Sequence, residues 1–499
     1  MATVAGSMHP KWKENWWWWE FYRLSYVGGK EYMSPSITQR WWFPKRSTTD
    51  EGVNRIRYEE GDLYSFLFRH GREENSDYDR RVLRSYYRNL TRPVVDTYAA
   101  HVYSKPVLRE YASVPELSEV AEKADGNQST IDEFMQAGLK WAQVYGHVFC
   151  VVDMPELQPG ELVTRADEQE RALRPYATWY SPLSVIDWEV DRYGRFLWVK
   201  LIEGDLRKLR VSAKDMRGPQ YASLFRTWYA DRWELHETAG NAQGQMIATG
   251  PNPIGRVPVE VLYGQRIAGE TEPVGQSRIG DIAVLNREIY NLDSLKQDMN
   301  YNQAFAFLVV PDKSGLVNAV DVGTTRSLTV NPDSGGMPQY VGPPVEYVQN
   351  LRDEIADLIL QIRAMAGLSR GVGEQSIAAR SGDALLIETH DKAVMLLSLA
   401  HEAQDFETRF WRLASRWLGS EWDGTVRYPD NYEVNTLGDD IDVALKFNQL
   451  NPPALAKAKV AETVMRRLLS SIAPDELDAI VAELHKQATM EEGIPSNGA

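Results

Sequence analysis

The sequence predicts an α+β protein that combines an antiparallel sheet region, long amphipathic helices and a small β insert. Residues 176–263 alternate short aromatic strands with turns, as in the runs Val185–Val190 and Phe196–Leu201. Residues 345–419 instead repeat apolar side chains at steps of three and four, the period of a helix with one buried stripe. Residues 306–344 are rich in Gly and Pro and contain strand-like runs, which indicates a compact insert.

Composition excludes several classes of protein. A formal charge of −15 over 499 residues argues against a broad basic face that grips nucleic acid. The single Cys150 excludes a disulfide framework within one chain, and its apolar neighbours indicate a buried strand with an inert thiol. No basic-then-apolar signal peptide opens the chain, and its longest strongly apolar run, 304–310, is too short for a membrane span. We therefore expect a soluble intracellular product.

The first 45 residues are rich in tryptophan. Four consecutive tryptophans, Trp16–Trp19, lie close to Phe21 and Tyr22 in the sequence. One interpretation is a belt at a membrane interface, and the other is burial against the rest of the chain or a neighbouring subunit. Glu14 and Glu20 flank the cluster and no basic amphipathic face accompanies it, which favours burial.

Residues 58–111 are expected to be largely helical and charged. Arg80, Arg84 and Arg88 alternate there with tyrosines, a mixture that can bind nucleic acid. Acidic residues are interspersed in the region, however, so a solvated helix face is the favoured interpretation over a nucleic-acid patch. A further helix is expected from Ile131 to Tyr145, leading into the strand of Cys150.

Three long helices are predicted over 276–305, 345–368 and 382–418. The first two carry matched apolar stripes through which they can pack against each other and against other subunits. These stripes are Ile282, Leu285, Ile289, Leu292, Leu295 and Met299, then Val348, Leu351, Ile355, Leu358, Ile362 and Met365. The third helix would run for roughly 50 Å, long for a globular domain. The glycine-rich, charged loop 369–381 precedes it, an arrangement more typical of a machine part than of a catalytic pocket.

The sequence contains no recognisable catalytic constellation. Gly29-Lys30 is followed by Glu31 and therefore lacks the pattern of a phosphate-binding loop. Gly371 and Gly373 form half of a dinucleotide fingerprint, but no strand precedes them. His401-Glu402 lacks the second histidine of a zinc protease motif. We expect no catalytic residue, no metal site and no cofactor, hence a protein that is not an enzyme.

The order of these elements resembles that of tailed-bacteriophage portal proteins, the head-to-tail connectors. Tyr87-Arg88-Asn89 and Val102–Val107 look like the N-terminal portal signature with its Lys-Pro-Val exit. Asn252–Leu262 is similar to the proline-containing connector before the first stem helix. Ser381–Leu385 resembles the Ser-Gly-x-Ala-Leu pattern at the start of the long helix. The resemblance covers about residues 55–490 and leaves the tryptophan-rich start outside.

The resemblance implies a portal-like organisation. Its parts would be the N-terminal segment 1–45, a mixed α/β wing 46–275, stem helices 276–305 and 345–368, a clip 306–344, a tunnel loop 369–381, a long wing helix 382–418, and a strand with crown helices 419–499. The site residues implied are Arg370, Gly371, Gly373, Gln375 and Arg380 at the DNA channel, and Ile282, Leu285, Ile289, Leu351, Ile355 and Leu358 in the packing of the stem.

The function implied is a twelve-subunit ring at one capsid vertex. It would be the channel for genome packaging and ejection, contacting double-stranded DNA without reading its sequence. Terminase, a head–tail adaptor, capsid protein and scaffold protein would be its partners, and no membrane would be involved. It would be assembled in the host cytoplasm and become part of the virion. An acidic wall suits such a conduit, because strong phosphate binding would stall transport.

Two alternatives remain open at this point. One is another virion structural protein, such as a minor head or adaptor component. The other is an enzyme with an unrecognised site in residues 130–265, where aromatic strands could line a sugar or nucleotide cleft.

Overall fold

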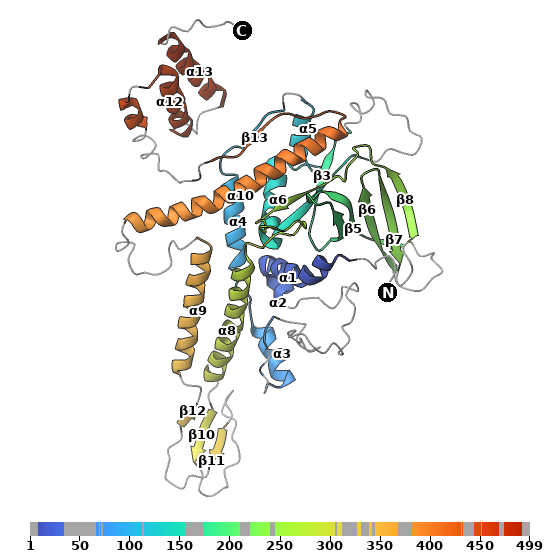
Figure 1. Ribbon diagram of the computed structural model, residues 1–499. Helices are drawn as coiled ribbons and strands as arrows, with labels where there is room; N and C mark the ends of the chain where they lie inside the picture. Colours follow the sequence, from blue (N-terminus) through green and yellow to red (C-terminus); the bar gives the residue numbers. More distant parts are fainter. Residues whose placement is uncertain are drawn as a thin grey trace. The chain divides into compact units, whose positions relative to one another are not determined.

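The structure, a computed structural model, is an α+β protein, as the sequence predicts (Figure 1). The chain divides into two compact units, Met1–Asp430 and Asn431–Ala499. The structure describes residues 8–33, 66–68, 70, 73–111, 114–155, 173–209, 220–239, 245–304, 307–311, 327–330, 339–341, 345–367, 382–430, 432, 444–450, 452–468 and 474–491.

The described helices of the first unit are α1 Pro10–Val27, α2 Gly29–Met33, α3 Asn75–Arg84, α4 Thr91–Val102, α5 Leu117–Glu122, α6 Ile131–Tyr145, α8 Gly280–Ala304, α9 Val345–Met365 and α10 Gly382–Trp417. Those of the second unit are α12 Ala454–Leu468 and α13 Pro474–Glu491. Among the described residues, no helix combines the length and the apolar character that crossing a bilayer requires.

The strands form four sheets. The largest is an antiparallel meander in the order β4-β5-β6-β7-β8, which confirms the antiparallel sheet predicted for this region. Its strands are β4 Val185–Val190, β5 Phe196–Leu209, β6 Gln220–Tyr229, β7 Arg232–Ala239 and β8 Gln245–Pro251. The second sheet has the order β3-β2-β9, with β2 His147–Asp153, β3 Tyr176–Tyr180 and β9 Val259–Tyr263.

The two smaller sheets connect distant segments. One has the order β11-β10-β12, in which β10 Phe307–Pro311 pairs parallel with β11 Ser327–Val330 and antiparallel with β12 Gln339–Val341. The other pairs β1 Leu108–Arg109 with β13 Val426–Arg427. Both β1 and β13 belong to the first unit, which ends at Asp430.

The core of the first unit forms around α6 and β2. Helix α6 begins with a capping box between Thr130 and Glu133 and ends at Gly146, whose φ of 96° suits glycine. In the next strand Cys150 is fully buried, and burial raises the pKa of its thiol well above the ordinary value. The prediction of a buried thiol in a core strand is therefore confirmed.

The tryptophan-rich helix α1 is part of this core. It buries Trp12, Trp19, Phe21 and Leu24, and it packs against α4, α6 and α8. Asn89 joins its end to the start of α4, because the Asn89 amide donates to the Tyr26 carbonyl at 2.8 Å. Of the predicted cluster, Trp19 is buried and Trp16 and Trp17 are half-buried, which confirms packing against the rest of the chain for these three, whereas Trp18 is 41% exposed.

Candidate functional site

Helices α8 and α9 form an antiparallel hairpin, and the β10–β12 sheet follows at their neighbouring ends (Figure 1). On α9, Val348, Ile355 and Ile362 are buried and recur every seven residues. On α8, Ile289 and Leu292 are buried as well. A repeat of this kind forms one continuous apolar seam between two helices.

The six residues predicted to pack the stem all lie on this hairpin, and none is exposed. Buried or half-buried side chains occur at Ile282, Leu285, Ile289, Leu351, Ile355 and Leu358. Their burial arises within a single copy of the chain. A substitution at these positions therefore affects the folding of the hairpin before it affects assembly.

Two members of the predicted stripes are misplaced. Leu295 on α8 is 44% exposed and Met365 on α9 is 42% exposed, whereas the neighbouring Ala366 is buried. For Met365, the last member of the α9 stripe, the reason is that a straight helix drifts by about 20° per heptad relative to a strict seven-residue repeat. At the end of the α9 stripe, Ala366 therefore takes the buried position in place of Met365.

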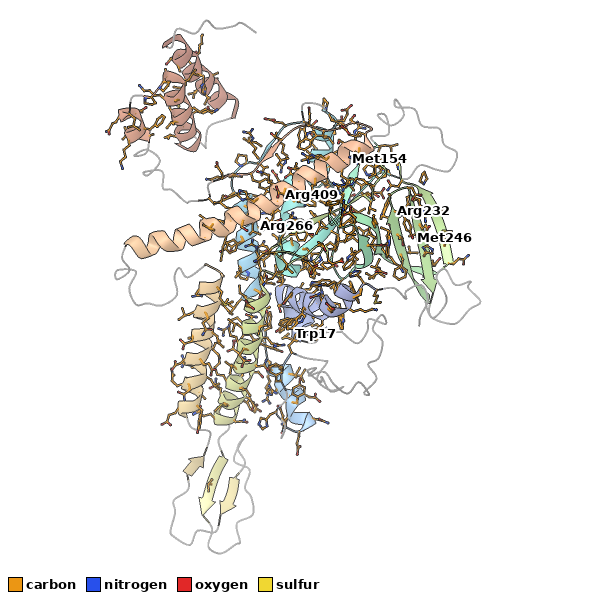
Figure 2. The ribbon with its side chains drawn as sticks, in the orientation of Figure 1. Trp17, Met154, Arg232, Met246, Arg266 and Arg409 are labelled. Atoms are coloured by element: carbon orange, nitrogen blue, oxygen red, sulfur yellow. The ribbon has the colours of Figure 1, made fainter. Side chains whose placement is uncertain are left out.

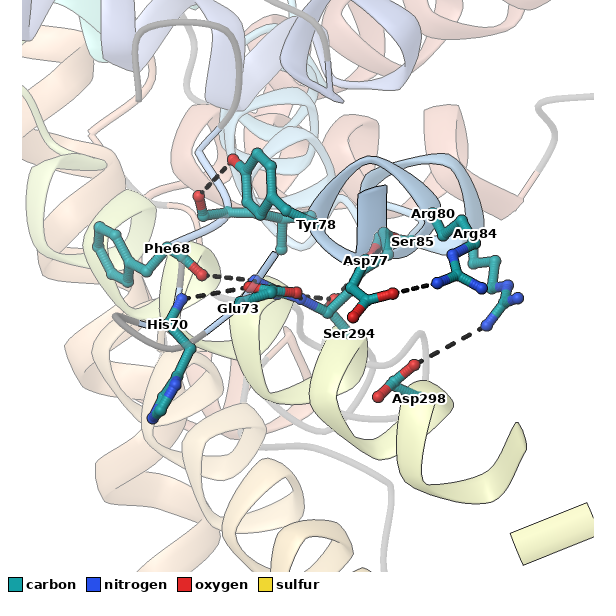
Figure 3. Close-up of polar contacts among 12 residues, drawn as sticks. Phe68, His70, Glu73, Asp77, Tyr78, Arg80, Arg84, Ser85, Ser294 and Asp298 are labelled. Carbon is teal, nitrogen blue, oxygen red and sulfur yellow. Dashed lines mark hydrogen bonds and ion pairs between the residues drawn. The ribbon is translucent and has the colours of Figure 1, made fainter. Parts of the chain in front are cut away.

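The other face of α8 is polar and packs against α3 (Figure 3). Arg81 of α3 is buried, and its guanidinium donates to both carboxylate oxygens of Glu73, at 2.7 and 2.8 Å. It also donates to the Phe68 carbonyl at 2.7 Å and to Ser294 Oγ at 3.2 Å. Ser85 Oγ donates to Ser294 Oγ at 2.7 Å, so α8 is tied to α3 through buried polar groups.

Arg84 lies at the outer end of the same interface. Its guanidinium lies 3.8 Å from Asp298 and 3.7 Å from the ring centroid of Tyr301. Nine residues, about two and a half helical turns, separate Leu285 from Ser294, Ile289 from Asp298 and Leu292 from Tyr301. The polar set and the apolar set therefore occupy opposite sides of α8, with α3 against the polar side and α9 against the apolar side.

A polar junction lies where α8 begins and α9 ends. Tyr98 of α4 donates through Oη to the Ala366 carbonyl at 2.8 Å. Arg278 donates to the Gly264 carbonyl at 2.6 Å and to Ser398 Oγ at 2.8 Å, and burial lowers its pKa. A pocket of about 340 Å³ opens beside it, lined by Tyr22, Gln276, Ser277, Arg278, Gly280, Asp281, Ile282 and Met365.

The long helix α10 is anchored in the core through its second half. Its stripe from Ala393 to Leu413 is buried as predicted. On its surface, Arg409 donates to Glu260 at 3.0 Å and to the Val261 carbonyl at 2.9 Å, and Arg266 reaches Glu402 at 2.8 Å (Figure 2).

Within this anchored half, Glu407 is a fully buried carboxylate. It accepts from Tyr428 Oη at 2.7 Å and from Trp411 Nε1 at 2.9 Å, and it pairs with Arg109. Burial raises the pKa of the Tyr428 hydroxyl, and the negative charge of the neighbouring Glu407 raises it further. The sequence does not predict the buried network of Glu407 or that of Arg81. In sequence, the polar residues of a buried network have the same spacing as those of a solvated helix face.

The five residues assigned to the DNA channel, Arg370, Gly371, Gly373, Gln375 and Arg380, lie outside the described residues. The part of the chain that the structure does describe holds no group of three His, Cys, Asp or Glu side chains arranged to bind a metal ion. The chain matches no protein-family model, and no curated protein sequence is significantly similar to it.

Proposed function

We propose that this protein is the portal protein of a tailed bacteriophage. It would form a ring of twelve subunits at one capsid vertex and serve as the channel for genome packaging and ejection. It would be assembled in the host cytoplasm and remain in the virion. This conclusion rests on the architecture between residues 280 and 417.

The observation that carries the proposal is a helical hairpin, connected by a small three-stranded sheet and followed by a 36-residue helix. A helix of that length extends for about 54 Å. The hairpin leaves Leu295, Tyr347 and Leu360 exposed, at 44%, 59% and 52% respectively. A ring of identical subunits covers such side chains through a heterologous interface that closes on itself.

The charge of the hairpin agrees with a conduit for DNA. Helices α8 and α9 together carry eight acidic residues against four basic ones, and six of the eight remain after Asp293 and Asp298, which pair with arginines of the same chain. Each phosphate that a channel neutralises adds affinity, so an acidic wall lets a duplex pass without being held. The tunnel loop 369–381 would then make the transient contacts, through Arg370, Gln375 and Arg380.

The β10–β12 sheet would face the narrow end of the ring. We propose that it contacts terminase during packaging and the head–tail adaptor afterwards. Capsid and scaffold proteins would contact the wing. An ATP-driven motor would be a separate protein.

The deciding experiment is native mass spectrometry of the purified protein together with negative-stain imaging. We expect hollow rings with the mass of about a dozen copies, the closed symmetric assembly proposed above. A monomer or dimer under all conditions would contradict the proposal. That result would favour one of the two alternatives, an enzyme with a site in residues 130–265 or another virion structural protein.

A packaging assay tests the channel itself. Arg370→Glu combined with Gln375→Glu should lower the amount of packaged DNA, provided that rings still form. The matched control is Arg192→Glu combined with Gln245→Glu, which makes the same charge change in exposed parts of the β-sheet region. Full genome content in the tunnel-loop variant would mean that this loop is only a linker.

A further inference from the structure

An arginine-rich surface adjoins α8 on the side of α3. Residues 80–95 contain five arginines and no acidic residue, although the chain as a whole is acidic. Four of these arginines, Arg80, Arg84, Arg88 and Arg92, recur every four residues. We refer to residues 80–92 as the arginine segment.

The arginine segment also exposes apolar side chains. Leu83 is 84% exposed and Tyr86 is 47% exposed. Arg80 keeps 62% of its side chain exposed, and Arg84 and Arg88 keep 35% and 36%. Exposed Leu and Tyr side chains between arginines are the composition of a protein–protein contact, in which Tyr and Arg contribute most.

An acidic surface lies on α9. Nine residues, about two and a half turns, separate Glu346 from Ile355, Val348 from Asp357 and Asp353 from Ile362. Since the three apolar partners are buried, Glu346, Asp353 and Asp357 all point away from the seam with α8. Arg352 and Arg363 lie roughly a third of a turn from this line. We refer to these three carboxylates as the acidic row.

The acidic row has no basic partner among the residues that the structure describes. Its one polar contact there is the amide of Gln349, which donates to Asp353 at 2.8 Å. All three side chains are exposed. Charges placed in this way are available to a second molecule.

The two surfaces lie on opposite sides of α8 and at the same height along it. Arg84 contacts Asp298, near the end of α8, and Arg88 lies 3.2 Å from Asp293, about 7 Å nearer its start. The acidic row occupies the first half of α9, which runs back from the same end of the hairpin. A rotation about an axis roughly parallel to α8 therefore brings one surface against the other without a shift along the axis.

We propose that the arginine segment of one copy binds the acidic row of the next copy. This inference rests on the proposed ring, and it names the two unlike surfaces that a head-to-tail interface requires. Opposite charges at matched height determine the register of the two copies, and like charges would oppose a two-fold dimer through either surface alone. Leu83 and Tyr86 would be the apolar contacts at its centre.

Charge exchange tests the pairing. Glu346→Lys, Asp353→Lys and Asp357→Lys together should convert rings into single copies in native mass spectrometry. Adding Arg80→Glu and Arg84→Glu to that variant should restore the rings. The control is Glu122→Lys, Glu421→Lys and Asp430→Lys, the same charge change at three other exposed carboxylates, which should leave rings intact.

Rings that persist in the acidic-row variant would overturn the pairing. If those rings also package less DNA, the acidic row faces the duplex instead. If the wild-type chain forms no ring at all, the proposed function fails and the pairing fails with it, a result distinct from the loss of rings in the variant alone.

Cross-linking provides a second measurement that does not depend on charge. Cys150 is the only cysteine and is buried, so introduced cysteines are the sites that a short bis-maleimide reaches. Leu83→Cys combined with Asn350→Cys should give a ladder of covalent multimers on a denaturing gel. Each single variant should give none, and a double variant without a ladder would count against contact between these surfaces.

Discussion

Tyr98 Oη donates a 2.8 Å hydrogen bond to the carbonyl of Ala366, and this contact fixes the last turn of α9 to α4. The two residues are 268 positions apart in the chain. Gly367 follows with φ of 57°, and a Cβ there would stand 3.0 Å from the Tyr98 hydroxyl. The end of the hairpin is thus positioned by a hydroxyl group that approaches the backbone closely.

Tyr98→Phe should lower the free energy of unfolding by about 1 kcal/mol, because the carbonyl of Ala366 loses its buried donor. Urea unfolding followed by circular dichroism measures the change. Tyr193→Phe is the control, since Tyr193 is 67% exposed, and it should change stability little. Equal effects of the two substitutions would show that the bond to Ala366 contributes nothing.

His147 should make the protein less stable in mild acid. It is fully buried, and burial lowers its pKa to about 3. The unfolded chain binds a proton near pH 6.5 and the folded chain does not, so stability falls as the pH drops below 6.5. Between pH 7 and pH 5 the loss from this group should be about 2 kcal/mol.

His147→Asn is the variant that tests this dependence, because its side-chain oxygen can accept the Gly275 amide that His147 Nδ1 accepts at 3.2 Å. Unfolding of both proteins at a series of pH values gives the comparison. From pH 7 to pH 5, the free energy of unfolding of the wild type should fall by about 2 kcal/mol relative to that of the variant. A constant difference would mean that His147 is protonated in the folded state.

Glu407→Gln should cost about 3–5 kcal/mol, because it leaves the guanidinium of Arg109 without its buried counter-charge. Arg109 also donates to Asp132 at 2.6 Å, and Asp132 is 53% exposed. Asp132→Asn is therefore the matched control on the same arginine, and it should cost no more than about 1 kcal/mol. Calorimetric unfolding distinguishes the two, and similar losses would contradict the role given to burial.

Ile355→Asp should destabilise the α8–α9 hairpin by several kcal/mol, since it buries a carboxylate in an apolar seam without a partner. Ile355 is 4% exposed, whereas Leu360 on the same helix is 52% exposed. Leu360→Asp should leave the fold of a single copy unchanged. Hydrogen exchange of α8 and α9 amides in the two variants measures the effect, and equal protection would place Ile355 outside the seam.

The long helices and the antiparallel sheet could be predicted because their apolar residues follow simple periods. Phe406 and Phe410 are buried where the stripe on α10 places them. The polar interior could not be predicted in this way. Asn291 and Ser294 on α8 are buried, yet in sequence they look like residues of a solvated face, because their partners come from distant segments.

The sequence pattern also does not predict which elements the start of the chain packs against. Burial of the tryptophan cluster could be argued from the acidic residues beside it, but not the elements that cover it. Tyr87 and Tyr290 surround Tyr32 of α2, at centroid distances of 3.7 and 5.5 Å, and they lie 55 and 258 positions further along the chain. Contacts between residues so far apart in the chain produce no periodic pattern in the sequence.

Helix α10 has a mechanical consequence. Its buried stripe begins at Ala393, while its first residue, Gly382, lies about 17 Å further along the helix axis. A helix is stiff over that length, so a tilt of α10 about Ala393 moves its start as a rigid rod. A tilt of about 5° would displace Gly382 by about 1.5 Å. Small rearrangements in the core are thereby amplified at the far end of the rod.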